Sequence, residues 1–246
     1  MPSSGVPEPL DTATPSVRAL TSLLIAPWDT LRHECHGSFV RAALGVSSRV
    51  AVTRPLMAFK ASLRAAWRLR CPNALKEPFW RLALDAIPGS RIHPWRCPCS
   101  ASVPSPHGRP HSFWDCPVAM AVRRALEAAV PGTTLHRSAL WLLRPPVPAC
   151  SAPVWRLVCL AAVDAMEHGR RLLWATHLRT APSPVPADVL TAIGDAAVAR
   201  VWSSLRDFAA AHNPVLPAFR VGPGHPFLAF VDGSLVVGPV PVPGVA

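Results

Sequence analysis

Three cysteines and one histidine near the middle of the chain constrain its fold more than any other sequence feature. Cys97 and Cys99 form one close pair, and His111 and Cys116 form a second. A structural zinc ion takes four such ligands in a tetrahedron, usually as two close pairs that a loop brings together. The segment between the pairs is polar and rich in proline and glycine, as expected of a loop. The spacing therefore predicts a zinc-binding loop.

Two other interpretations stay open at the level of the residues alone. Buried cysteine often packs as a small hydrophobic side chain without any ligand. In addition, His93 or His107 could replace His111 as the fourth ligand, because both lie close to the cysteines in the sequence.

The residues around this cluster carry a family resemblance. An apolar run contains Phe79-Trp80-Arg81-Leu82 and ends in Ile87-Pro88, and the histidine is followed by Phe113-Trp114-Asp115-Cys116-Pro117. In this pattern, residues 75–126 resemble the reverse-transcriptase zinc-binding domain, which follows the polymerase in many plant and algal non-LTR retrotransposons. The first pair is C-x-C, where the family has C-x2-C. The resemblance implies that Cys97, Cys99, His111 and Cys116 bind zinc and that the protein derives from a retrotransposon.

The rest of the chain predicts a mainly α-helical protein. Proline and glycine interrupt the sequence, and between them apolar residues recur at spacings of three and four. The expected helices cover residues 16–44, 57–70, 75–87, 118–130, 154–174 and 187–212, with two helical turns between residues 136 and 143. One strand-like segment, residues 227–237, lies near the C-terminal end.

The same interruptions predict the domain organisation. We expect helical units around a small zinc-binding loop, with proline-rich linkers and disordered termini. The segments are a disordered leader (1–15), a helical region (16–130) that contains the zinc module, a linker (131–152), a helical hairpin (153–213) and a proline- and glycine-rich tail (214–246).

The charge favours a polyanionic partner, nucleic acid first. The formal net charge is +11, and all basic residues except Lys60 and Lys76 are arginines. GC-rich codon usage also explains an arginine-rich chain without tyrosine, but the charge attracts phosphate whatever its origin. Arginines neutralise phosphate and tryptophans stack on bases. More often, however, a basic amphipathic helix such as residues 57–70 packs its apolar stripe inward and leaves its arginines solvated, and the two uses are compatible. The residues expected to contact nucleic acid are Arg64, Arg68, Arg70, Arg91, Arg96, Arg109, Trp95 and Trp114, and Trp67 could also stack on a base.

Two further groups of polar residues have plainer explanations than a site. Residues 33–36 contain two histidines and a cysteine, but they are too close in sequence to surround an ion without a distant ligand, so we expect a solvated helix face. Asp164 and Glu167 fit a polar helix stripe, in which Glu167 pairs with Arg171 one turn later.

Near the end of the chain, Phe230-Val231-Asp232-Gly233-Ser234 resembles the first strand of ribonuclease H. That resemblance implies that Asp232 would be the first metal-binding carboxylate. The chain ends twelve residues after Ser234, so the other acidic residues of such a site are missing, and Asp-Gly-Ser is also a common turn. We therefore expect no ribonuclease activity.

The expected function is non-catalytic binding of nucleic acid, either RNA or single-stranded DNA. A chain without tyrosine cannot carry the Tyr-x-Asp-Asp polymerase signature, and the sequence has neither a glycine-rich phosphate loop nor a Gly-x-Ser-x-Gly elbow. The alternatives are a zinc-stabilised scaffold for protein–protein interaction and a retroelement remnant with no selected function.

The sequence predicts a nuclear or cytoplasmic protein that is neither secreted nor inserted in a membrane. No apolar run reaches the ~18 residues of a membrane span. The first residues include Glu8 and Asp11 and lack the apolar region of a signal peptide. The sequence does not indicate the oligomeric state.

Overall fold

The structure is a computed structural model, and it confirms the prediction of a mainly α-helical fold. It describes residues 17–86, 97–99, 109–129, 134–146, 151–180, 185–212, 227–231 and 234–238. The predicted disordered leader and most of the predicted tail lie outside these residues. Among the described helices, none combines the length and the apolar character that crossing a membrane requires.

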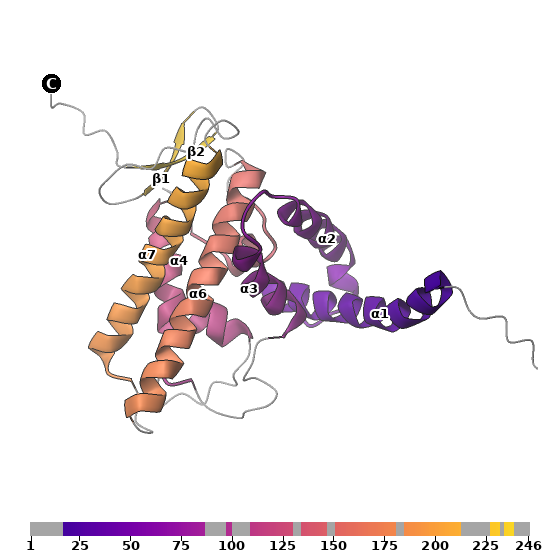
Figure 1. Ribbon diagram of the computed structural model, residues 1–246, viewed down its shortest axis with the longest axis horizontal. Coiled ribbons are helices and arrows are strands. Elements are labelled where there is room, and N and C mark those ends of the chain that lie inside the picture. Colours follow the sequence, from indigo (N-terminus) through magenta and orange to yellow (C-terminus); the bar gives the residue numbers. More distant parts are fainter. Residues whose placement is uncertain are drawn as a thin grey trace, which may run out of the picture.

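The helices lie close to the positions that their apolar spacing predicts (Figure 1). In chain order, the elements are α1 (Val17–Leu44), the short 3-10 turn η1 (Val50–Val52), α2 (Thr53–Trp67), α3 (Asn73–Leu84), the wide turn η2 (His111–Asp115), α4 (Pro117–Ala129), α5 (Arg137–Trp141), α6 (Ala152–Thr180), α7 (Ala187–His212), β1 (Phe227–Val231) and β2 (Ser234–Gly238). Helix α2 begins before the predicted residue 57 and ends before residue 70, and α6 continues beyond residue 174.

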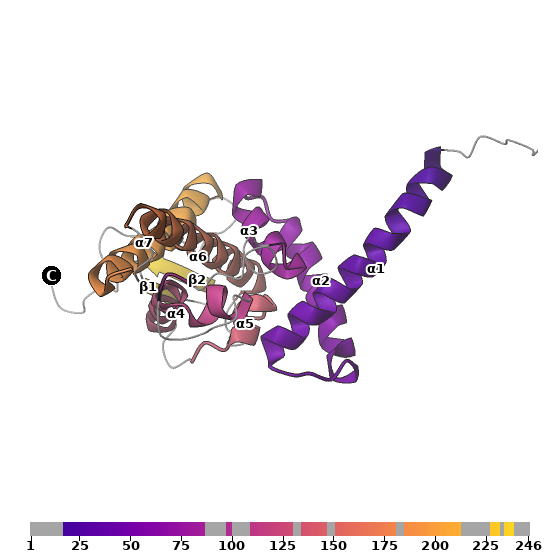
Figure 2. The ribbon, with the colours of Figure 1, turned by 90° about the horizontal axis from the view of Figure 1, so that it is seen from below.

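Helix α6 is the centre of the fold. It packs against α7, α4, α3 and α2, and residues 157–167 are all buried. A helix that is apolar almost all round is stable only when other elements surround it, which explains this central position. Figures 1 and 2 show α4 and α7 on one side of α6 and α1 to α3 on the other.

The segment predicted as a linker contributes to the core. Trp141, Leu142 and Leu143, at the end of α5, are fully or almost fully buried. The Trp141 ring stacks on Phe39 of α1, with 5.3 Å between the ring centroids. The described helices on both sides of the segment therefore share one hydrophobic core.

The acidic residues of α6 are buried rather than solvated. Arg200 of α7 donates to Asp164 at 2.7 Å. Glu167 accepts from Arg170 at 2.7 Å and from Arg171 at 3.3 Å. The predicted pairing of Glu167 with Arg171 is thus confirmed, and every one of these carboxylates has a cationic partner that offsets its burial.

The predicted strand is a two-stranded antiparallel hairpin. Phe227 pairs with Gly238 at one end and Val231 pairs with Ser234 at the other, and β1 lies against α4. Asp232, the residue that matches ribonuclease H, lies outside the described residues.

One part of the predicted solvated face of α1 is buried. His36 is only 3% exposed, and its ring meets Phe59 edge-on at 5.6 Å and Trp80 at 6.2 Å. The prediction is wrong for this residue because α2 and α3 cover this side of α1. His33, by contrast, is exposed as predicted.

Close packing at Gly169 generates a prediction for stability. A Cβ atom at this position would overlap Cγ1 of Val118 on α4 and lie 3.2 Å from Cβ of Ala197 on α7. We expect Gly169→Ala to lower the free energy of unfolding by about 1–3 kcal/mol, because overpacking outweighs the helix propensity of alanine. Chemical denaturation measures this value. Gly37→Ala on α1 is the control, since a Cβ there would meet only the Arg41 side chain at 3.7 Å. Equal effects of the two substitutions would contradict the packing argument.

Burial of His36 predicts a pH dependence of stability. Desolvation, followed by the positive charges of Lys60, Arg32 and His33, lowers the pKa of His36 from 6.5 to about 4. The unfolded chain therefore binds a proton more readily, so stability is complete above pH 6.5 and falls as the pH decreases toward 4. The loss between about pH 7 and pH 5 should be on the order of 1–2 kcal/mol. His36→Leu should remove this component in denaturation curves, and an unchanged pH dependence would refute its origin in His36.

Candidate metal centre

The structure brings together the ligand set that the sequence predicts. One ligand atom from each of Cys97, Cys99, His111 and Cys116 lies within 4.8 Å of all the others. The three cysteines are buried, and His111 is partly exposed. Around a tetrahedral zinc ion, with Zn–S of about 2.3 Å and Zn–N of about 2.0 Å, neighbouring ligand atoms are about 3.5–3.8 Å apart. The 3.4 Å between Cys99 Sγ and His111 Nε2 is close to that value. The cluster could therefore hold a metal ion.

The second pair is brought together by the wide turn η2. The Cys116 amide donates to the His111 carbonyl at 2.7 Å, a bond across five residues instead of the usual four. In a regular α-helix, residues five apart point in different directions, whereas this wider turn returns them to the same side. Pro117 then begins α4, a position at which the absent amide hydrogen costs nothing. The H-x4-C spacing and the proline after it thus fit the geometry.

The first pair is held by the C-terminal half of the chain. The Val185 amide, just before α7, donates to the Pro98 carbonyl at 3.0 Å. Val185 is itself buried. A metal ion in the cluster would consequently connect residues 97–99 with the start of α4, at a point that also contacts the segment between α6 and α7.

The electrostatics of the cluster favour a positively charged ligand. Hydrogen bonds from the Cys116 thiol and then from Cys99 lower the pKa of Cys97 well below its usual range. Hydrogen bonds to Cys97 and Cys99 raise the pKa of His111 to about 10, and hydrogen bonds to the same two sulfurs raise the pKa of Cys116. A bound dication would take the three sulfurs as thiolates and the imidazole in its neutral form, and it would displace the protons that these groups share.

The ligand set fits a structural site better than a catalytic one. Three thiols and an imidazole fill a tetrahedral shell, whereas catalytic zinc sites keep one position for water or substrate. Soft sulfur ligands also exclude magnesium and calcium, which prefer oxygen. His111 is the histidine that the structure places in the cluster. His93 and His107 lie outside the described residues.

Arg109 does not belong to a nucleic-acid surface, and this prediction is wrong. The residue is 8% exposed, and its Nε pairs with Asp85 at 3.1 Å. Its other nitrogens donate to Ser38 Oγ at 3.0 Å and to the Leu82 carbonyl at 3.4 Å. Arg109 therefore connects α1 and α3 to the residues that precede η2. Spacing in the sequence does not reveal this role, because its partners come from distant segments.

Trp114 is only partly available for stacking. Its ring is half-buried against the core, and the Arg123 guanidinium lies 4.7 Å from the ring centroid. One face of the indole is thus in a cation–π contact within the protein. Arg91, Arg96 and Trp95 lie outside the described residues.

The predicted cations of α2 are on the surface. Arg64, Arg68 and Arg70 are exposed, and among the described residues none of them pairs with a carboxylate. Arg32 of α1 and Trp80 of α3, which sequence reasoning did not select, lie near Arg64 and Arg68 around one opening. No local signal joins these residues, since they lie on three separate helices.

No protein-family model, curated protein or solved structure matches this chain.

Metal content tests the cluster directly. We expect one metal ion per chain by inductively coupled plasma mass spectrometry and a large loss of metal in Cys116→Ser, because a tetrahedral site with three ligands binds much more weakly. Cys35→Ser is the matched control, since this half-buried thiol lies on α1 and outside the cluster. Equal metal content in the two variants would exclude Cys116 as a ligand.

Proposed function

We propose that the protein binds nucleic acid without catalysis and that a zinc ion stabilises its fold. The observation that carries the proposal is the set of exposed arginines Arg64, Arg68 and Arg70, which have no carboxylate partner among the described residues. Cations of this kind remain available to neutralise phosphate groups. The formal net charge of +11 extends the attraction to the whole chain.

Zinc is the metal that the donor chemistry favours. Three cysteine ligands with one histidine are a common set for structural zinc. With these four ligands bound, a tetrahedral ion would have no open coordination position for water or substrate. The relation to the reverse-transcriptase zinc-binding domain belongs to the same proposal, and the order of motifs in residues 75–126 supports it. In this view the zinc loop maintains the helical framework, and the arginines contact the nucleic acid.

A scaffold for protein partners has less support. Among the residues whose side-chain exposure the structure describes, which exclude residues 17–30 of α1 and the β1–β2 hairpin, the large exposed apolar side chains are Leu31, Val46, Val50, Met57 and Trp67. An apolar docking surface needs a contiguous patch of such residues. Exposed arginines occur on several described elements, and Arg54, Arg64, Arg68 and Arg70 lie on α2 or directly after it.

Salt dependence tests the proposal. We expect the zinc-loaded chain to bind a labelled single strand of about 12 nucleotides, with an affinity that falls steeply between about 50 and 200 mM salt. Each lost phosphate contact should reduce the slope of log K against log salt by about 0.7, so Arg70→Gln should flatten it by about that amount. Fluorescence anisotropy measures both quantities.

Arg206→Gln is the control for total charge, since Arg206 is exposed on α7. It should leave the slope close to that of the unmodified chain. Binding that does not respond to salt would instead support an apolar interface. If the zinc-loaded chain binds neither single-stranded nor duplex nucleic acid at low salt, the proposed function is wrong.

A further inference from the structure

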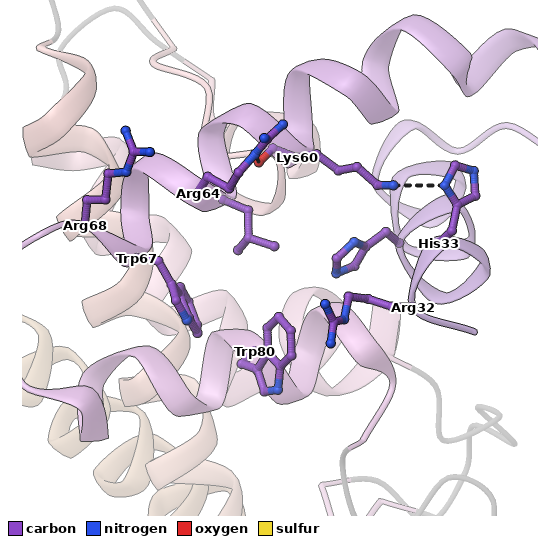
Figure 3. Close-up of a pocket in the computed structure, with 9 residues that line it drawn as sticks. Arg32, His33, Lys60, Arg64, Trp67, Arg68 and Trp80 are labelled. Carbon is purple, nitrogen blue, oxygen red and sulfur yellow. Dashed lines mark hydrogen bonds between the residues drawn. The ribbon is translucent and has the colours of Figure 1, made fainter. Parts of the chain in front are cut away.

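A groove opens between α1, α2 and α3, and none of the residues that line it belongs to the Cys/His cluster (Figure 3). Its volume is about 750 Å³. That size lies within the usual range of ligand sites, which is roughly 300–1,000 Å³. The groove is accessible from solvent, and Leu63 and His36 are the buried residues among those that line it.

The lining is cationic without any acidic residue. Lys60, Arg64 and Arg68 contribute charge from α2 and the residue after it, and Arg32 contributes charge from α1. The Lys60 ammonium donates to Nδ1 of His33 at 2.9 Å, which fixes its direction across the opening (Figure 3). Arg64 is tied to the helix by its bond to the Lys60 carbonyl at 3.3 Å. Like charges gathered without carboxylates between them favour an anion.

Two indole rings provide the aromatic part of the groove. Trp67 and Trp80 are 5.5 Å apart between centroids and tilted by 42°. They touch each other, so a base cannot enter between them and must stack on an outer face. Trp67 is 39% exposed and offers such a face. On Trp80, the Arg32 guanidinium lies 5.8 Å from the ring centroid.

A buried lysine, Lys76, holds the backbone at Trp67 by two hydrogen bonds. Lys76 on α3 is 8% exposed, and its ammonium donates to the Trp67 carbonyl at 3.1 Å and to the Leu69 carbonyl at 2.8 Å. These are carbonyls at the C-terminal end of α2, where a cation is most favourable. The backbone of Trp67 is therefore fixed before any ligand arrives, which lowers the entropic cost of binding.

One buried polar group at the groove has no partner. Neither ring nitrogen of His36 has a hydrogen bond within the described structure, although the residue is 3% exposed and lines the groove. A buried polar atom without a partner is costly and is normally satisfied by water or by a ligand. A neutral imidazole can offer one donor and one acceptor to such a ligand.

We propose that this groove binds one nucleotide unit of a single-stranded nucleic acid, with the base stacked on Trp67 and the phosphate held by Arg64, Arg68 and Lys60. The inference rests on the proposed function and specifies its site and its strand type. A duplex keeps its bases paired and stacked, so only an unpaired base can reach the indole. Aromatic rings beside cations are the usual combination for binding single strands.

The test compares variants of the zinc-loaded full chain in anisotropy titrations with a labelled single-stranded RNA of about 12 nucleotides. We expect Trp67→Ala to weaken binding about 10-fold, the effect of losing one stacked base. Trp67→Phe should restore most of the affinity, because it keeps an aromatic face. Arg64→Gln and Arg68→Gln should each weaken binding, whereas Arg206→Gln on α7 should not. Thermal unfolding verifies that each variant is folded. If an arginine variant is unfolded, Lys60→Gln takes its place as the test of phosphate contact, and if Trp67→Ala is unfolded, the stacking test uses Trp67→Leu.

Several results would overturn the inference while leaving the proposed function intact. One is salt-dependent binding that Trp67→Ala and Arg64→Gln do not change more than Arg206→Gln does. Another is binding of duplex RNA as tight as that of the single strand. A mononucleotide that binds as tightly as the oligonucleotide would overturn the assignment to a strand. Polyglutamate that displaces RNA as well as unlabelled RNA does would show that the groove recognises charge alone. Failure of the unmodified chain to bind any nucleic acid would overturn both proposals together.

Discussion

The burial of α6 is the constraint on which the rest of the fold depends. Its residues 157–167 are all buried, and α2, α3, α4 and α7 each pack on part of its surface. Each large apolar side chain that is fully buried in this way contributes about 1.5–3 kcal/mol. The contribution is available only when helices from both halves of the chain are in place. The Cys/His cluster and the groove between α1, α2 and α3 are therefore parts of one folded unit, although they are formed by different residues.

The Cys/His cluster brings together two described segments of the chain. The C-x-C pair lies in the short segment 97–99, which is buried and whose Pro98 carbonyl accepts from the Val185 amide, and the other two ligands lie at η2 and directly after it. A metal ion bound to the four residues would fix the geometry of both segments, and its free energy of binding would become part of the free energy of folding. Arg109 makes a second connection, because its bonds to Asp85, Ser38 and Leu82 connect α1 and α3 to the residues that precede η2. Arg109 thereby connects the N-terminal helices to the segment that carries His111 and Cys116.

The arginines of this chain fall into two groups, those that pair with carboxylates and those that line the groove. Arg109, Arg170 and Arg200 pair with carboxylates and stabilise the interior or its edge. Arg64 and Arg68, which have the same chemistry, face an opening that has no acidic lining. The net charge of the chain does not distinguish these two groups. They differ in whether a carboxylate lies beside the guanidinium, because a carboxylate partner offsets the charge that would otherwise attract phosphate.

The sequence by itself determined the local features of this protein. Apolar residues at spacings of three and four marked α2, α4 and α7 within a few residues, and the two close pairs of ligand-type residues marked the metal cluster. These signals are local, since helix periodicity and ligand spacing act over a few turns of the chain. The tertiary structure decided which polar residues are buried and which lie together. It placed Arg109 and His36 inside and assembled the groove from Arg32, Lys60 and Trp80, because burial depends on what distant helices bring against each residue.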